Sequence, residues 1–454
     1  MSAPAPGRVQ DVLRGLIIAA LVLAPLALGS VTEAAFVPLL VVCFVVGLVS
    51  WARGHVRRTL GDDVDEVPLA APLLAFCALV LFQLLPLPPF LLRRLSPGSF
   101  AFYHDRMLVP VAHFWPISVS PPDTLCGLAF LAGFGLLFGA VFREFDDERW
   151  RRRLAYNVVL VGLAMTVVGL VQAAYGTRRI YGLVQPVYDW AVFGPYVNRS
   201  HFAGYVIMSI PLAVAFALEA LSGLRKEWRR RRRGWLALGG PQANAFVRRS
   251  VEAMVLVVGL VASASRGGFV AFVASMAALP FTSRHRRSAG AVVLLVAVLG
   301  LPWVGLGEIV RGFESRGIQG SRIDLWRDML PMFPSFPLLG SGFNAFGTAY
   351  APYQTIWRGL FIGEAHDDYI QVLLDTGLVG AGIFAVVLAR VLAAAARAAR
   401  RSPLGVGLLG SLLALAFHAL VDFNWQIPAN AATYVALAAV AFREARSRSV
   451  DAAA

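Results

Sequence analysis

Long runs of apolar residues, separated by short polar and basic segments, recur along almost the whole chain. Most runs contain roughly 18–20 residues, enough for a helix to cross the ~30 Å hydrocarbon core of a bilayer. The pattern therefore predicts an all-α polytopic integral membrane protein with about 12 transmembrane helices. The predicted spans are residues 11–30, 34–52, 68–86, 122–142, 154–174, 200–222, 250–264, 267–282, 289–306, 367–395, 404–421 and 428–442.

The composition agrees with this prediction. Of the 454 residues, 58% are hydrophobic and 15% are charged, whereas a soluble domain is usually about 45–50% apolar and about 25% charged. These values exclude a soluble enzyme, a disulfide-stapled secreted domain and a disordered chain. Cys43, Cys77 and Cys126 lie in or at the edge of apolar runs. Because no CxxC pair or Cys/His cluster occurs, the cysteines indicate neither a zinc site nor a disulfide framework.

Basic residues are distributed unevenly between the two sides of the predicted bundle. With the N-terminus in the cytoplasm, the inward segments carry most of the 41 lysines and arginines, although the outward loops are longer in total. The positive-inside rule therefore predicts an even number of spans with both termini cytoplasmic. The net charge of +14 has the same explanation and does not indicate nucleic-acid binding. We interpret the most basic loop, residues 224–249, as a topology anchor that also lies on anionic lipid.

The spans divide the chain into four parts. Residues 1–150 contain the first four spans, and residues 151–306 contain the next five. Residues 307–366 form the largest outward loop, and residues 367–454 contain the last three spans.

Within the large outward loop, residues 321–330 have helical periodicity, and Pro331 would end the helix. Such a helix would lie in the interface plane instead of crossing the membrane. The apolar side chains expected on its buried face are Ile323, Trp326, Met329 and Leu330.

A polar break at residues 263–269 separates two short apolar helices on the outer side. Arg266 lies in this break after Ser265, and Gly267 and Gly268 open the following helix. Free backbone N–H groups and the positive end of the helix dipole therefore point toward the same place as Arg266. This combination favours a phosphate site. The alternative is a tight turn with a snorkelling arginine.

A second basic point on the outer side is Arg199, just before the sixth span. Either Asn198 or Ser200 is expected to cap the helix that follows. Arg199 is a second candidate for binding phosphate. The alternative is a capped helix that carries a surface arginine.

A third polar segment, residues 364–369, leads from the large outward loop into the tenth span. We expect His366 in the first turn of that helix, where the dipole disfavours imidazolium and keeps the ring neutral, as a general base requires. Glu364, Asp367 or Asp368 would orient the ring. A structural histidine is the alternative.

His418 and Asp422 near the eleventh span are four residues apart, a spacing that brings two side chains together on one helix face. We interpret them as a structural pair.

The sequence does not support metal or nucleotide chemistry. No set of His, Asp and Glu has the spacing of a metal site, and no P-loop, GxGxxG or nucleophile elbow occurs. A neutral histidine and several arginines on the outer face instead indicate transfer from a phosphorylated donor without ATP. Because the periplasm has no nucleotide-sugar pool, the donor would already be energised and would reside in the membrane.

At these residues the chain resembles the bacterial O-antigen ligase and O-antigen polymerase family. The order and spacing of the similar segments agree over roughly residues 190–430, whereas the first 150 residues agree mainly in hydropathy. The similar segments are GPYVNRSHFAGY at 194–205, SASRGGF at 263–269, SRIDLWRDMLPMFPSFPLLGSGFNAFGTAY at 321–350, EAHDDYIQVLLDTGLVG at 364–380 and HALVDFNWQIPAN at 418–430.

The resemblance implies a GT-C-like helical glycosyltransferase of the bacterial inner membrane, independent of metals and other cofactors. Such enzymes take a glycan from undecaprenyl pyrophosphate on the periplasmic side and transfer it to lipid A–core or another glycan. By position, Arg266 and Arg199 would bind the pyrophosphate, with Arg322 as a further contact, and His366 would deprotonate the acceptor hydroxyl. Ser265, Gly267, Gly268 and Asp367 complete the expected substrate site.

The chain departs from the family pattern at two positions. Asp367 follows the histidine where the family often has Asn, and Ser200 stands where the family often has Asn. Either difference would alter the fit of the acceptor without removing a charge that the mechanism needs.

Three other functions remain open. A polymerase of the same family differs from a ligase in its acceptor, which would be another repeat-bearing lipid. A flippase of lipid-linked glycan would use the same arginines, but it needs charges along a path through the midplane. A scaffold for envelope assembly does not explain Arg266 and His366. Membrane lipids are expected partners, and nucleic acid is not.

Overall fold

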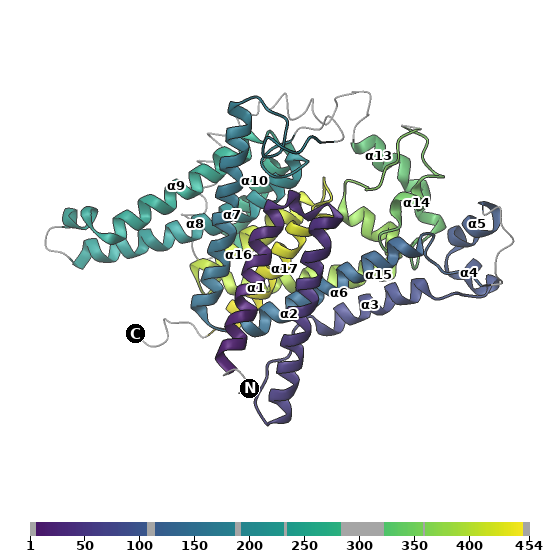
Figure 1. Cartoon of the computed structure of the whole chain (residues 1–454), viewed down its shortest axis with the longest axis horizontal. Helices are drawn as coiled ribbons and strands as arrows, with labels where there is room; N and C mark the ends of the chain where they lie inside the picture. Colours follow the sequence, from purple (N-terminus) through teal and green to yellow (C-terminus); the bar gives the residue numbers. More distant parts are fainter. Residues whose placement is uncertain are drawn as a thin grey trace.

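The computed structural model describes residues 6–106, 114–186, 192–230, 234–282, 322–356 and 359–447. Within these ranges the regular structure is helical, accompanied by isolated β-bridges such as Leu87–Trp115. Figure 1 shows the long helices packed side by side, with shorter helices gathered at one side of the bundle.

Every predicted span except 289–306, which lies outside the described residues, coincides with a described helix. Among the described helices, α1, α2, α6, α7, α8 and α15 are long and apolar enough to cross a membrane, so this is a multi-pass membrane protein. The helices that coincide with predicted spans are α1 (Pro6–Leu26), α2 (Glu33–Thr59), α3 (Ala70–Leu84), α6 (Pro121–Glu144), α7 (Glu148–Ala174), α8 (Arg199–Arg230), α9 (Pro241–Ala262), α10 (Arg266–Thr282), α15 (Asp368–Ala399), α16 (Pro403–His418) and α17 (Pro428–Arg446).

The basic segment 224–249 is more helical than a loop. Helix α8 continues to Arg230, α9 already begins at Pro241, and a 3-10 turn, η2, covers Gly234–Gly239. The two helices lie side by side and project from the bundle in Figure 1. The positive charge is therefore carried largely on a helical hairpin.

The core is centred on α8 and α17. Every residue of α8 from His201 to Ala213 is buried, and so is nearly all of α17 from Pro428 to Phe442. Helix α8 packs against α9 and α16, and α17 packs against α6 and α15. Because α8 and α17 are enclosed by other helices, their first residues are held in fixed positions.

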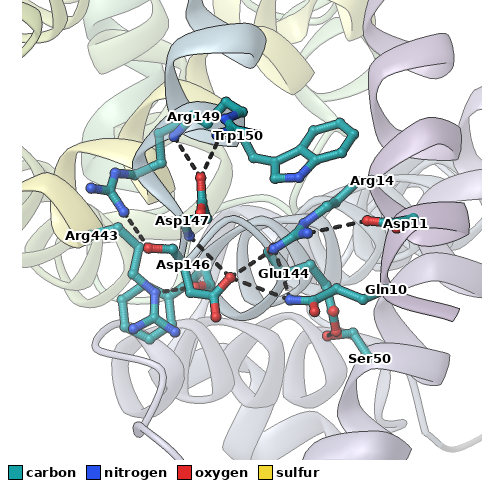
Figure 2. Close-up of polar contacts among 12 residues, drawn as sticks. Gln10, Asp11, Arg14, Ser50, Glu144, Asp146, Asp147, Arg149, Trp150 and Arg443 are labelled. Carbon is teal, nitrogen blue, oxygen red and sulfur yellow. Dashed lines mark hydrogen bonds and ion pairs between the residues drawn. The ribbon is translucent and has the colours of Figure 1, made fainter. Parts of the chain in front are cut away.

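A polar network fastens one end of the bundle (Figure 2). The Nε of Arg14 on α1 donates to the carbonyl of Glu144 at 2.6 Å, and its Nη2 lies 2.8 Å from an oxygen of Asp146. Arg53 of α2 pairs with the Glu144 carboxylate at 2.8 Å, and Arg443 of α17 pairs with Asp65. Segments assigned to the cytoplasm by the positive-inside rule therefore lie together.

The short helices are α4 (Pro89–Leu95), α5 (Pro97–Arg106), α13 (Arg322–Met329) and α14 (Phe346–Tyr350). Helix α13 confirms the helix predicted within residues 321–330. Its buried face differs, because Leu325 and Met329 are buried whereas Ile323 and Leu330 are exposed. The buried side chains pack with those of α14 and the segment before α15, including Phe346, Tyr350 and Ala365. Helix α13 is therefore fixed to the polypeptide that carries His366.

Candidate active site

Four segments that are far apart in the sequence meet at the end of the bundle opposite the polar network. Ser265 Oγ and Ser200 Oγ lie 3.3 Å apart, which joins the starts of α10 and α8. A Cβ atom at Gly267 would lie 3.4 Å from His418 Nε2, so α10 also begins beside the end of α16. The start of α15 contacts the turn after α16, because Asp368 N donates to the carbonyl of Ala419 at 2.9 Å.

Side-chain caps fix the starts of α8 and α10. Asn198 Oδ1 accepts the N–H of Ser200 at 2.8 Å, so Asn198, one of the two predicted candidates, is the cap of α8. Ser265 Oγ accepts the N–H of Gly268 at 3.3 Å in the first turn of α10. Both caps are short polar side chains of the type that satisfies free N–H groups at helix starts.

Arg199 and Arg266 are the first residues of α8 and α10, and both are partly exposed. Their positive charges interact with each other, so the two candidate phosphate-binding residues lie together. Two guanidinium groups beside two helix N-termini are a favourable environment for an anion.

The adjacent glycines pack closely against neighbouring segments. A Cβ at Gly268 would lie 2.7 Å from Ala203 Cβ, and one at Gly267 would lie 3.1 Å from Val421 Cγ2. The glycines therefore permit close packing of α10 on α8 and on the turn after α16. Their expected place in the substrate site stays a prediction.

Asp422, in the turn between α16 and α17, is the centre of a buried polar cluster. Its carboxylate is fully buried and lies 3.7 Å from His366 Nδ1 and 3.8 Å from His201 Nε2. It also lies 3.9 Å from His418 Nε2 and 3.6 Å from Arg322 Nη2. One carboxylate is thus surrounded by three imidazoles and one guanidinium.

The surroundings of Asp422 favour its ionised form. Burial alone would raise the pKa of this carboxyl, but the interaction with His366 and the charge of Arg322 outweigh burial and lower the pKa below its usual range. Asp422 is therefore a fixed negative charge beside His366.

The predicted contact between His418 and Asp422 is present, with 3.9 Å between Nε2 and Oδ2. His418 is fully buried, and its Nδ1 lies 3.1 Å from Asn424 Nδ2. Asn430 is linked to the same group, because Asn430 Nδ2 donates to Asn424 Oδ1 at 2.9 Å. Asp422 also faces His366, the candidate base, at 3.7 Å. The sequence signal for such contacts is the position of Asp422 at the end of an apolar span, because a buried carboxylate needs partners.

His366 lies just before α15 and not in its first turn. Its φ of +53° is left-handed, which is uncommon for a residue other than glycine and often occurs at functional sites. The side chain is 34% exposed, and its ring packs edge-on against Phe423 at a centroid distance of 4.9 Å. The backbone therefore directs His366 toward Asp422 while leaving part of the ring accessible.

The three carboxylates expected to orient His366 have other partners. Asp367 caps α15 by accepting the N–H groups of Tyr369 and Ile370, at 2.9 and 3.0 Å. Asp368 accepts the Trp425 N–H at 3.0 Å, and Glu364 accepts from Gln371 Nε2 at 2.6 Å. Asp422 is therefore the carboxylate that faces the ring.

Burial dominates the electrostatics of two of these groups. It raises the pKa of Glu364 to about 7, although hydrogen bonds from Gln371 and Gln426 oppose this shift. Burial also raises the pKa of Asp367 above its usual value, against the opposing effect of the N–H groups that it caps. Both carboxyls are thus easier to protonate than an exposed acid.

Arg322, at the start of α13, reaches the same cluster. Its Nη1 donates to the carbonyl of Val421, and its Nη2 faces Asp422. Its side chain is 34% exposed. The predicted contact of Arg322 with phosphate stays a prediction, because its described contacts are to the turn that carries Asp422.

A cavity of about 700 Å³ lies beside this cluster, and His201 and Phe423 contribute to its wall. Most of its lining is aliphatic or aromatic, from α3, α6, α15, α17 and the segment between α1 and α2. Volumes of this size accommodate ligands larger than water or an ion.

These features define the class of the protein. It is a multi-pass helical membrane protein with a buried histidine–aspartate cluster and a pair of arginines at one end of its helix bundle. Residues 253–385 match the family model described as O-antigen ligase. The chain carries an O-antigen ligase family domain, and the resemblance in its sequence is confirmed. The match includes Arg266, Arg322 and His366, whereas Arg199 and Asp422 lie outside it. No curated protein matches the sequence.

Proposed function

We propose that the protein is a glycosyltransferase that moves a glycan from undecaprenyl pyrophosphate to an acceptor hydroxyl at the periplasmic face of the bacterial inner membrane. The observation that carries this proposal is His366, partly exposed and facing the buried, ionised Asp422 at 3.7 Å. The family match supports an enzyme of the ligase or polymerase type.

In the proposed reaction, His366 accepts the proton of the acceptor hydroxyl through Nε2. The acceptor oxygen attacks the anomeric carbon, and the bond from that carbon to the pyrophosphate oxygen breaks with inversion. The proton remains on His366, where Asp422 stabilises the imidazolium, as a carboxylate behind a catalytic histidine does in other enzymes.

The leaving pyrophosphate carries the electron pair of the broken bond. Arg199 and Arg266 would bind its oxygens, because fixed positive charges near a developing anion lower the barrier without reorganisation. Their positions at the joined starts of α8 and α10 support this role. No nucleotide or metal takes part in any of these steps.

Transfer in a reconstituted system tests the proposal. Purified protein in liposomes would receive labelled undecaprenyl-pyrophosphate glycan and an acceptor glycolipid, without ATP and with EDTA. The proposal predicts a labelled acceptor and released undecaprenyl pyrophosphate. Movement of the donor between leaflets without transfer would contradict it and favour a flippase.

Ligase and polymerase activity differ in the acceptor and can be separated in cells. In a deletion strain, loss of polymer on lipid A together with accumulation of lipid-linked polymer would identify a ligase. Accumulation of single lipid-linked repeats would identify a polymerase.

A further inference from the structure

Four buried polar side chains form a continuous chain of hydrogen bonds that ends beside Asp422. Tyr196 Oη donates to Asn430 Oδ1 at 2.8 Å, and Asn430 Nδ2 lies 2.9 Å from Asn424 Oδ1. Asn424 Nδ2 in turn lies 3.1 Å from His418 Nδ1. Each of the four residues is no more than 1% exposed. Because a buried polar group without a partner is costly, the chain favours one arrangement of its donors and acceptors.

Glycines enclose this chain at both ends. A Cβ atom at Gly204 of α8 would overlap Asn424 Oδ1 and would lie 3.0 Å from Asn430 Nδ2. Cβ atoms in the first turn of α10 would lie 3.4 Å from His418 Nε2 at Gly267 and 3.6 Å from its Cε1 at Gly268. The imidazole of His418 is therefore packed closely, and its two nitrogens have different neighbours.

A backbone carbonyl fixes the direction in which the two amides point. Asn430 Nδ2 also lies 2.9 Å from the carbonyl oxygen of His201. A carbonyl only accepts, so this end of the Asn430 amide is the NH2 group, and its second N–H needs an acceptor. That acceptor is Asn424 Oδ1. Asn424 therefore directs its own NH2 group toward His418.

The position of the proton on His418 follows from this order. The NH2 group of Asn424 only donates, so His418 Nδ1 accepts and carries no proton. The proton of the neutral ring is then on Nε2, which faces Asp422 Oδ2 at 3.9 Å. His201 on α8 and Arg322 on α13 also interact with His418. An imidazolium would place a second positive charge near Arg322.

The two oxygens of Asp422 have different surroundings. Oδ1 accepts the N–H of Phe423 at 3.0 Å and faces His366. Oδ2 has no hydrogen bond within the described protein and faces His418 Nε2 and, at 3.6 Å, Arg322 Nη2. His418 is fully buried, whereas the side chain of Arg322 is 34% exposed. An N–H dipole directed at a buried carboxylate stabilises its charge and its orientation.

We propose that His418 is a positioning residue for the pair formed by His366 and Asp422. The chain from Tyr196 keeps His418 in the neutral form with its proton on Nε2. This form stabilises Oδ2 by its N–H dipole, does not neutralise the carboxylate, and leaves Oδ1 directed at His366. The role in transfer rests on the function proposed above, whereas the position of the proton is a property of the fold alone.

Nitrogen-15 NMR of the full-length protein in lipid nanodiscs tests the position of the proton without donor or acceptor. The nitrogen shifts of an imidazole distinguish a protonated from an unprotonated nitrogen. The chain has 7 histidines, and the signals that disappear in His418→Gln or His418→Asn are those of His418. At neutral pH we expect a proton on Nε2 and none on Nδ1. A protonated Nδ1 in the wild type would overturn the inference.

Asn424→Asp moves this proton with little change of shape. The new carboxylate still accepts from Asn430 but cannot donate to His418, so Nδ1 becomes protonated. Either Nε2 then loses its proton, or an imidazolium forms and competes with His366 for the charge of Asp422. The kcat of transfer should fall by about tenfold, the effect of about 1.4 kcal/mol, while the KM for the donor stays unchanged. Asn244→Asp makes the same change at an exposed position of α9 and should leave kcat unchanged.

A pair of variants at His418 distinguishes positioning from packing. His418→Gln keeps an N–H donor near the position of Nε2 and should retain more activity than His418→Leu, which fills space without a donor. Equal kcat values for the two variants would overturn the inference. Wild-type kcat in Asn424→Asp, with NMR showing a protonated Nδ1, would overturn it as well.

The two measurements separate this inference from the proposed function. A wild-type protein that has the proton on Nε2 but transfers no glycan would refute the glycosyltransferase and leave the assignment of the proton intact. Glycan transfer that does not depend on the position of this proton would refute the role of His418 and leave the proposed function intact.

Discussion

His366 Nδ1 faces Asp422 Oδ1 at 3.7 Å, although 56 residues and two helices separate them in the chain. The left-handed backbone of His366 and the tight turn after α16 bring the two side chains together. Because Asp422 is buried and ionised, it is suited to stabilise a positive charge on His366 and to fix the orientation of its ring.

Asp422→Asn should lower transfer by about 10²-fold or more, because the amide has nearly the same shape but cannot stabilise an imidazolium. Donor binding should change little. The rate would be measured in the reconstituted transfer assay. Asp147→Asn is the matched control, because Asp147 caps α7 at the other end of the bundle, and asparagine also caps helices and should preserve most activity. Equal rates for the two variants would refute a special role for Asp422.

Arg266→Ala should abolish detectable transfer and weaken binding of the pyrophosphate donor. Arg266→Lys should retain only part of the activity, because lysine lacks the planar fork that engages two phosphate oxygens. Arg199→Ala should also weaken donor binding. Binding of labelled donor to each purified variant measures this effect, with Arg327→Ala on the exposed side of α13 as the control. Wild-type donor affinity in Arg266→Ala would refute the phosphate site.

Glu364 makes stability depend on pH. Its pKa is about 7 in the folded protein and 4.5 for an exposed glutamic acid. The folded state therefore binds more protons between these values, and the free energy of unfolding falls as the pH rises across this interval. Glu364→Gln removes the titration, so its melting temperature relative to wild type should rise between pH 5 and pH 8. A constant difference would contradict the raised pKa.

The distribution of arginine predicts the orientation of the protein in the membrane. In a cysteine-free background, Ala351→Cys should react with an impermeant thiol reagent added outside, whereas Gly239→Cys should react only after permeabilisation. Both positions are exposed. The opposite pattern would place the candidate site on the cytoplasmic side.

The sequence predicted the helices well, because a span needs only a long apolar run. It also indicated Arg199, Arg266 and His366 as candidate site residues, since a charged or titratable group at a membrane boundary requires a reason. It could not assign the partner of His366. The carboxylates adjacent in sequence, Glu364 and Asp367, are engaged locally, and the one in contact comes from a distant turn.

The cavity was beyond prediction for a similar reason. Tyr434 and Trp425 look like ordinary interface aromatics in the sequence, and Asp375 looks like an isolated acid within a span. Only the packing of α15 and α17 brings them into one lining. The roles of Gly267 and Gly268 also depend on which helices approach them.

The most direct test of the account separates donor binding from transfer in His366→Gln. Glutamine forms hydrogen bonds but cannot accept a proton at neutral pH, and loss of a general base typically costs about 10²–10⁴-fold in rate. The account predicts near-normal binding of undecaprenyl-pyrophosphate glycan by the purified variant and a loss of transfer of that size in the reconstituted assay. Undiminished transfer by His366→Gln would contradict it.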